Sequence, residues 1–229
     1  MTMRKQYVAD LEKIRSEITG MGHKTVQSVE AAVKSLVTLN LDEAEASRQY
    51  EKTVDAMNAV IDKDCIITIA TQSPAASDVR FIVASLKIAS EIERVADYAN
   101  NIAKTVQKRL TADNLKPVAG LMGDIETLGM RAAAMLDEAV TAFLNNDADL
   151  ASSVRAKDAE VNKIYKSLQA RLPYIPLHSP EEQSALLEIN NCIRYLERVA
   201  DRATNVAEWV FYIATGFPAA KDKIGAERA

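Results

Sequence analysis

Two distant stretches of this sequence repeat the same order of charged and amide residues. The first reads EIERVADYANN at 91–101 and the second reads YLERVADRATN at 195–205. Each has a Glu, an Asp and an Asn spaced four residues apart, namely Glu93, Asp97 and Asn101, then Glu197, Asp201 and Asn205. On a helix this spacing stacks three oxygen-bearing side chains on one face over two turns. Such a face is suited to binding a hard metal ion.

A second pair of acidic or amide residues lies in the segment before each repeated stretch. These residues are Glu51 and Asp55 before the first stretch, and Asp158 and Asn162 before the second. If the two helices of each copy run antiparallel, four or five oxygen ligands meet at one point. Like charges four residues apart repel by a few tenths of a kcal/mol, and a bound cation turns that repulsion into attraction. We therefore expect divalent or trivalent metal ions at both clusters, with Mg, Mn, Fe and Zn as candidates.

The same residues also fit an interpretation in which no metal binds. An acidic helix face is often solvated and neutralised by basic side chains, which here are Arg94, Arg198 and Arg202. Arg94 and Arg198 each follow a motif Glu by one residue, so they lie about 100° away around the helix. From there they reach either an acid on a neighbouring helix or a partner protein. The residues alone leave both interpretations open.

Long helices must carry these side chains, because residues that interrupt helices are scarce. The chain has 7 Gly and 6 Pro among 229 residues, and apolar residues between Ile88 and Val106 follow a heptad-like spacing. Segments containing proline, at 73–74, 113–117 and 173–180, mark the ends of helices. We predict six helices, at 4–38, 41–71, 75–110, 117–145, 147–172 and 180–215.

An internal repeat indicates that the six helices form two copies of one unit. MGHKTVQSVEAAV from Met21 resembles LGMRAAAMLDEAV from Leu128, an offset of 107 residues, and the offset is 104 for the acidic stretches. Similarity of composition alone is the alternative. We disfavour it because the matched acids and the matched Gly22 and Gly129 are predicted to lie outside the apolar seam.

The predicted fold is all-α, with two tandem antiparallel three-helix bundles related by internal duplication. We place the bundles at 1–113 and 114–229, with a short flexible tail at 216–229.

Composition and charge exclude several classes of protein. A net charge of −4 is opposite in sign to the basic character of most nucleic-acid-binding proteins. Cys65 and Cys192 are the only cysteines, so we expect neither a disulfide framework nor a thiolate zinc site. The charged start of the chain lacks the apolar core of a secretion signal, and the run WVFYIATGF is too short to cross a bilayer. We therefore expect a cytoplasmic protein.

The residues do not indicate an enzyme. Di-iron carboxylate bundles use a Glu-x-x-His motif, and neither His23 nor His178 has a Glu three residues before it. The sequence has no glycine-rich phosphate loop, and no Ser or Cys nucleophile has a recognisable base. We therefore expect a protein without catalytic activity.

The repeated motif resembles the signature of the PhoU family, the phosphate-specific transport system accessory proteins. That signature is a Glu-Arg-x-x-Asp frame that occurs twice, here at 93–97 and 197–201. Three further stretches are similar to the family: ADLEKIRSEITGMG (9–22), SPAASDVR (73–80) and NVAEWVFYIATG (205–216). The sequence departs from the family in having Val-Ala where Ile-Gly is common. It also has Asn162 where many members have an acid, and a neutral amide weakens cation binding at the second cluster.

The resemblance implies a function that the residue spacing does not. PhoU-like proteins are cytoplasmic negative regulators of phosphate uptake and of the phosphate-starvation response. They act between the ATPase subunit of a phosphate ABC transporter and a sensor histidine kinase, are often homodimers, and carry metal ions at the acidic motifs.

We accordingly expect this chain to be a metal-binding adaptor in which Arg94 and Arg198 contact a partner. We expect no nucleic-acid partner, and contact with the membrane only through partner proteins. The alternatives are a helical adaptor or a metal-storage or metal-sensing protein that is unrelated to phosphate control.

Overall fold

The computed structural model describes residues 3–219, which form six α-helices and two short 3-10 helices. The α-helices are α1 (Met3–Thr38), α2 (Leu41–Gln72), α3 (Ala76–Arg109), α4 (Met122–Asn145), α5 (Ala148–Arg171) and α6 (Pro180–Thr215); the 3-10 helices are η1 (Lys116–Leu121) and η2 (Leu172–Tyr174). The six predicted helices are confirmed. The largest difference is at α4, which was expected to begin at 117. Pro117 lies in η1 instead, because proline lacks a backbone donor and a tight 3-10 turn suits a short connector.

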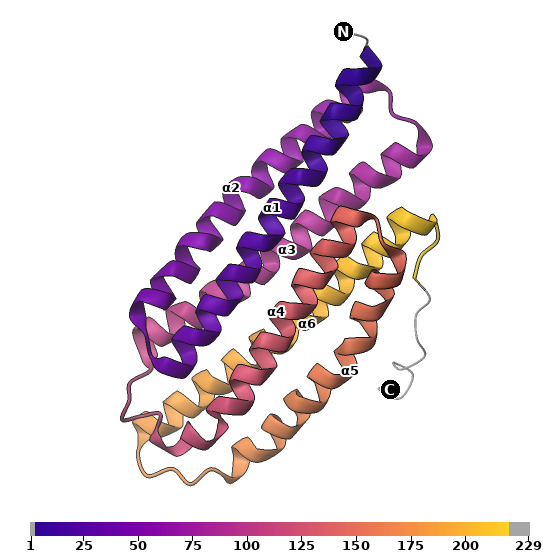
Figure 1. The fold of residues 1–229 in the computed structure, drawn as a ribbon. Coiled ribbons are helices and arrows are strands. Elements are labelled where there is room, and N and C mark those ends of the chain that lie inside the picture. Colours follow the sequence, from indigo (N-terminus) through magenta and orange to yellow (C-terminus); the bar gives the residue numbers. More distant parts are fainter. Residues whose placement is uncertain (1–2, 220–229) are drawn as a thin grey trace.

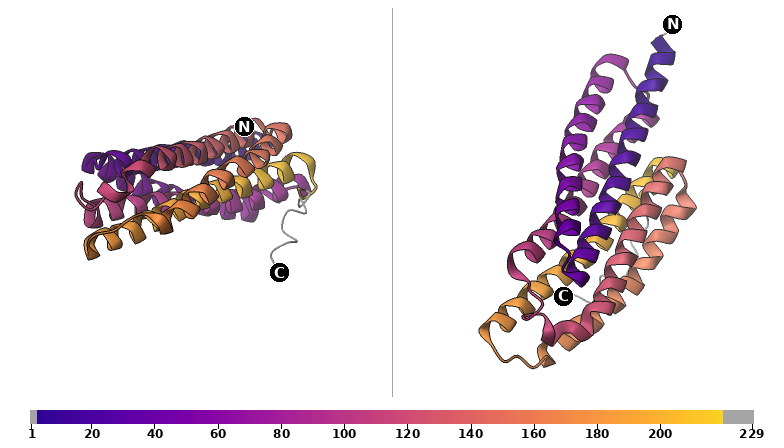
Figure 2. Two further views of the ribbon diagram at one scale, coloured as in Figure 1. Left: turned by 90° about the horizontal axis from the view of Figure 1, so that it is seen from below. Right: turned by 60° about the vertical axis from the view of Figure 1, so that its left-hand side comes forward.

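The helices form two antiparallel three-helix bundles that lie side by side along a common direction (Figure 1). The first bundle contains α1, α2 and α3, and the second contains α4, α5 and α6. Across the bundles α1 packs against α4 and α3 packs against α6, whereas α2 and α5 pack mainly on helices of their own bundle. The α2–α3 turn and the α5–α6 loop lie at opposite ends of the molecule, and two further views show the same elongated shape (Figure 2).

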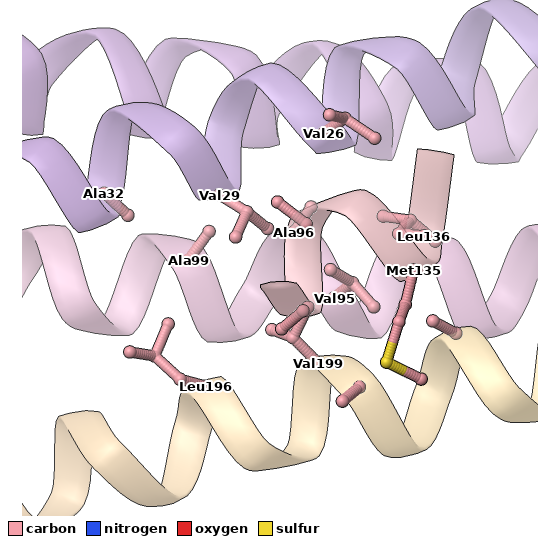
Figure 3. Packing of buried hydrophobic residues seen from close by; sticks show 14 of the residues in the cluster. Val26, Val29, Ala32, Val95, Ala96, Ala99, Met135, Leu136, Leu196 and Val199 are labelled. Atoms are coloured by element: carbon pink, nitrogen blue, oxygen red, sulfur yellow. The ribbon is translucent and has the colours of Figure 1, made fainter. Parts of the chain in front are cut away.

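One hydrophobic core runs through both bundles. Side chains of α1, α3, α4 and α6 point into a shared interior, where Val95 of α3 lies near Val199 of α6 (Figure 3). These two fully buried valines occupy the same position in the two copies, at an offset of 104 residues. The bundles therefore meet around an approximate twofold axis. The predicted boundary between 113 and 114 falls in the linker between α3 and η1, and it stays a prediction.

The contact between α1 and α4 is close because each helix presents a glycine to a valine of the other. A Cβ atom added at Gly22 would clash with Val140, and one added at Gly129 would clash with Val33. Gly22 and Gly129 are 107 residues apart, and so are Val33 and Val140. The two contacts are therefore copies of each other. The expectation that these glycines lie outside the apolar seam is wrong, since both are buried in this contact.

The outer helices α2 and α5 begin with the same cap. Oδ1 of Asn40 accepts hydrogen bonds from the backbone N–H groups two and three residues ahead, at 2.9 and 3.3 Å. Oδ1 of Asp147 does the same at 3.0 and 2.9 Å. The preceding residues, Leu39 and Asn146, both have left-handed backbone, with φ of 54° and 52°. Asn40 and Asp147 therefore recur at the same offset because they cap equivalent helices.

The run WVFYIATGF begins inside α6 and ends just after it. Within residues 3–219, no helix is long and apolar enough to cross a membrane. Of the tail predicted at 216–229, residues 220–229 lie outside the described part of the chain.

Candidate functional site: two acidic clusters

The first acidic cluster combines residues of α2 and α3 whose charges act on one another. Partial burial raises the pKa of Glu93, and the carboxylates of Asp97 and Asp55 raise it further, while Arg94 lowers it. Partial burial and the charge of Asp97 also raise the pKa of Asp55. Glu51 adds to the negative charge around Glu93. The antiparallel packing of α2 on α3 thus brings the four predicted acids of this copy to one region.

Asn100, which is not among the residues predicted from the sequence, joins the two helices of this cluster. Its Nδ2 donates a hydrogen bond to Oε1 of Glu51, and the residue is only 4% exposed. Its Oδ1 is buried and accepts no hydrogen bond from the described residues. Asn101, which keeps the four-residue spacing, is half-buried on α3. Asn100 lies seven residues after Glu93, a spacing that also returns to the same helix face and that could have identified it.

The second acidic cluster contains a hydrogen bond within α5. Nδ2 of Asn162 donates to Oδ2 of Asp158 at 2.6 Å. Burial raises the pKa of Asp158, and this hydrogen bond opposes the shift. The other oxygen of the carboxylate, Oδ1, is buried and has no donor among the described residues. On α6, Glu197 is half-buried and Asp201 is exposed.

Asn205 reaches the other bundle. Its Nδ2 donates to Oε2 of Glu91 on α3 at 3.2 Å, and Nη1 of Arg202 donates to the same oxygen at 3.0 Å. The side chains of Glu91 and Arg202 are 17% and 26% exposed, so the contact is partly buried. The sequence alone does not single out Glu91, because no local spacing connects it to partners more than a hundred residues away.

Two tyrosines and an arginine extend the contact between α3 and α6. Tyr98 stacks on Tyr195 with ring centroids 5.8 Å apart. The guanidinium group of Arg198 lies over the Tyr98 ring, 5.9 Å from its centroid, which is within the range of a cation–π interaction. Arg94 and Arg198 are both exposed, so a partner protein can reach them.

The clusters have the right ligand chemistry for a hard cation, but their side chains are not assembled around one point. Within residues 3–219, no three carboxylate, histidine or cysteine side chains converge closely enough to hold an ion. The buried oxygens of Asn100 and Asp158 that lack donors are acceptors that a cation would satisfy. Metal binding would therefore require the carboxylates to change rotamer, and only in the first cluster do the helices already bring several of them near one another.

Comparison with known proteins reproduces the duplication seen in the fold. The sequence matches the PhoU domain twice, at residues 18–106 and 125–210. The chain belongs to the PhoU family. The second PhoU match begins 107 residues after the first and ends 104 residues after it, which are the offsets that relate the glycines and the acidic motifs.

Relatives within the PhoU family cover nearly the whole chain. The phosphate-specific transport system accessory protein PhoU homolog of Pseudomonas aeruginosa is 32% identical over 212 residues, which span 93% of this chain and 86% of the relative. The phosphate-specific transport system accessory protein PhoU of Escherichia coli (strain K12) is 29% identical over 211 residues. These residues span 92% of this chain and 86% of the relative.

Solved PhoU structures have the same fold. The crystal structure of PhoU from Pseudomonas aeruginosa matches with a TM-score of 0.81 at 30% identity, over 92% of this chain and 100% of that one. The phosphate transport system regulatory protein PhoU from Streptococcus pneumoniae matches with a TM-score of 0.83 at 23% identity. The match covers 94% of this chain and 100% of that one. The predicted arrangement of two tandem bundles is therefore confirmed.

Proposed function

We propose that this chain is a non-enzymatic negative regulator of phosphate uptake and of phosphate-starvation signalling. It acts in the cytoplasm, as a homodimer, as an adaptor between the ATPase subunit of a phosphate ABC transporter and a sensor histidine kinase. It holds metal ions at its two acidic clusters. The observation that carries this proposal is the similarity of both bundles to proteins named phosphate-specific transport system accessory proteins.

The position of the acidic motifs supports a docking role. Both motifs lie on α3 and α6, the helices that meet between the bundles, and each includes an exposed arginine, Arg94 or Arg198. Charges of both signs on one surface favour the right partner and orientation more than they increase affinity. Such an adaptor regulates its partner by binding one of the partner's conformations more tightly than the other.

Bound metal ions would stabilise this surface, because they would neutralise the repulsion between neighbouring carboxylates. The charge of Asp97 disfavours the charged forms of Asp55 and Glu93, and the charge of Asp55 acts on Glu93 in the same direction. A cation bound between α2 and α3 would be held by these oxygens and would stabilise the packing of the two helices. The shape of the docking surface would then depend on whether the metal is bound.

The test of the regulatory role is complementation of a strain whose own gene for this protein is deleted. A reporter driven by a phosphate-starvation promoter is measured in phosphate-rich medium. We expect the reporter to be on in the deletion strain and off when the wild-type gene is returned. A reporter that stays off in the deletion strain would contradict the proposed role and favour an adaptor or storage protein unrelated to phosphate control.

The test of the metal ligands is the double substitution Asp97→Ala with Asp201→Ala. We expect the helices to stay folded by circular dichroism, the metal content of the purified protein to be lost, and regulation to weaken. The matched control is Glu30→Ala with Asp137→Ala, a repeated pair of exposed acids on α1 and α4. Elemental mass spectrometry measures the metal content of both proteins. Unchanged metal content in the first variant would contradict the assignment of Asp97 and Asp201 as metal ligands.

A further inference from the structure

The two helices of the first cluster share a longer pattern than their acids alone. Each helix carries a Glu, an Asp and an Asn at positions i, i+4 and i+7, which are Glu51, Asp55 and Asn58 on α2, and Glu93, Asp97 and Asn100 on α3. Residues with this spacing lie on one face of a helix. Each helix therefore has one face with two carboxylates and one amide.

The register of α2 against α3 brings the ends of these two faces together. Nδ2 of Asn100 donates a hydrogen bond to Oε1 of Glu51, so these two residues lie level with each other on the two helices. The helices pack antiparallel and have the same rise per residue. Seven residues further along α2, and seven residues back along α3, the residues that come level are Asn58 and Glu93.

The two aspartates lie in the middle of this arrangement. Asp55 follows Glu51 by four residues and Asp97 precedes Asn100 by three, so the same register places Asp55 beside the turn that carries Asp97. The charge of Asp97 raises the pKa of Asp55, which agrees with this register. Each end of the arrangement thus has a Glu from one helix and an Asn from the other.

The amide oxygens of both asparagines lack a hydrogen-bond donor. Oδ1 of Asn58 and Oδ1 of Asn100 are buried, and neither accepts a hydrogen bond from the described residues. Asn100 is only 4% exposed, and its amide lies between α2 and α3, since its nitrogen reaches Glu51 on the facing helix. A buried acceptor without a donor costs free energy, and a bound cation would satisfy it.

The second cluster has neither amide. At the offset of 107 residues Asn58 corresponds to Tyr165, and at the offset of 104 residues Asn100 corresponds to Thr204. The Thr204 hydroxyl donates to the backbone carbonyl of Ala200 within α6, at 3.2 Å. Of the two clusters, only the first therefore has the paired pattern.

We propose that Asn58 and Asn100 are metal ligands whose amide oxygens complete the set of Asp55 and Asp97 in the first cluster. This inference rests on the metal binding in the proposed function. Two carboxylates and two amides supply oxygen ligands with a total charge of −2, which suits a hard divalent cation such as Mn²⁺ or Mg²⁺. Within residues 3–219 no three carboxylates converge, so the amides take the place of a third carboxylate.

The experiment is calorimetric titration of Mn²⁺ into the full chain carrying Asp201→Ala, which removes a predicted ligand of the second cluster. In this background we expect Asn100→Ala and Asn58→Ala each to weaken Mn²⁺ binding tenfold or more. A group that only orients a metal ligand is worth about 10–100-fold in metal affinity, and a ligand itself should be worth at least as much.

Asn100→Asp separates the role of a ligand from a structural role. An aspartate keeps an oxygen at this position, but at pH 7 it cannot donate a hydrogen bond to Glu51. As a ligand it restores the Mn²⁺ affinity that Asn100→Ala loses, although its melting temperature without metal falls because two carboxylates then face each other. If Asn100 served only to hold Glu51, Asn100→Asp would bind Mn²⁺ no better than Asn100→Ala.

The matched control is Asn190→Ala in the same background. Oδ1 of Asn190 accepts a hydrogen bond from Nε2 of Gln169 at 2.8 Å, which joins α5 to α6 outside the first cluster. Its loss should lower the melting temperature and leave Mn²⁺ affinity unchanged. The melting temperature of every variant, measured without metal, shows whether the chain remains folded.

Three results would overturn the inference alone while the wild-type chain binds Mn²⁺. These are an unchanged affinity in folded Asn100→Ala or Asn58→Ala, an Asn100→Asp variant as weak as Asn100→Ala, and an equal loss of affinity in Asn190→Ala. If the wild-type chain binds no Mn²⁺, the metal part of the proposed function fails and this inference fails with it.

Discussion

Individual carboxylates in the first cluster are destabilised by their neighbours. Partial burial and the charge of Asp97 both raise the pKa of Asp55 and of Glu93, and the opposing charge of Arg94 does not reverse the rise at Glu93. A folded-state pKa above the unfolded value means that the folded protein binds this proton more tightly than the unfolded chain does. The stability that comes with the proton is therefore lost as the pH rises through the folded-state value.

Replacing Asp97 by Asn should stabilise the protein when no metal is present. Removing this charge lowers the pKa of both neighbours towards their ordinary values, so less stability is lost on going from about pH 4 to about pH 7. We expect the melting temperature at pH 7 in the presence of a chelator to rise by about 1 °C. Thermal unfolding followed by circular dichroism across this pH range checks the prediction. A lower melting temperature in Asp97→Asn at pH 7 would show that the acids do not repel one another.

At the scale of the elements, close approach of helices distinguishes α1 and α4 from the outer pair α2 and α5. The reciprocal contacts of Gly22 with Val140 and of Gly129 with Val33 allow the α1 and α4 backbones to come near each other. By contrast, Gly123 at the start of α4 has open space where a Cβ would lie. The glycines of this protein therefore have different roles, which substitution by alanine can separate.

We expect Gly22→Ala and Gly129→Ala each to destabilise the protein by about 1–2 kcal/mol. The added methyl group overpacks a valine that is 1% exposed, at a cost of about 1–3 kcal/mol, and the higher helix propensity of alanine returns up to about 1 kcal/mol. Gly123→Ala is the matched control and should be neutral or slightly stabilising, because nothing opposes its methyl group. Chemical denaturation measures all three. Equal effects at the three positions would mean that the helix contact does not require glycine.

At the scale of the whole molecule, the two bundles are parts of one folded unit. The core is continuous, and α1 and α3 bury side chains such as Val29 and Val95 against the second bundle, while α4 and α6 do the same in return (Figure 3). A bundle taken alone would expose this inner face to water. An exposed apolar surface of that extent drives association or loss of tight packing.

We therefore expect the fragments 1–113 and 114–229 to be unstable apart and stable together. Each fragment alone should self-associate or melt without a cooperative transition, because the apolar side chains that pack against the other bundle are exposed. The two expressed together should form a one-to-one complex with a cooperative transition. Size-exclusion chromatography with light scattering and thermal unfolding measure both properties. A monomeric first fragment with its own sharp transition would instead make the predicted boundary a true domain boundary.

The sequence alone determined the six helices, their order and the duplication. These features depend on local spacing: apolar periodicity, the scarcity of Gly and Pro, and residues that recur at a constant offset. The acidic stripe of each motif was visible for the same reason, since residues four apart on a helix share a face. Whether these residues bind metal stays a prediction.

Only the tertiary structure decided which side chains meet. The bond of Asn100 to Glu51, the bond of Asn205 to Glu91, and the meeting of Gly22 with Val140 join residues far apart in the chain. Such pairs depend on the register in which one helix packs against another, and the spacing along a single helix contains no information on that register. For this reason the two motifs are indistinguishable by spacing in the sequence. The packing of α3 on α6 makes their asparagines different, because it places Asn205 against Glu91 of the other bundle.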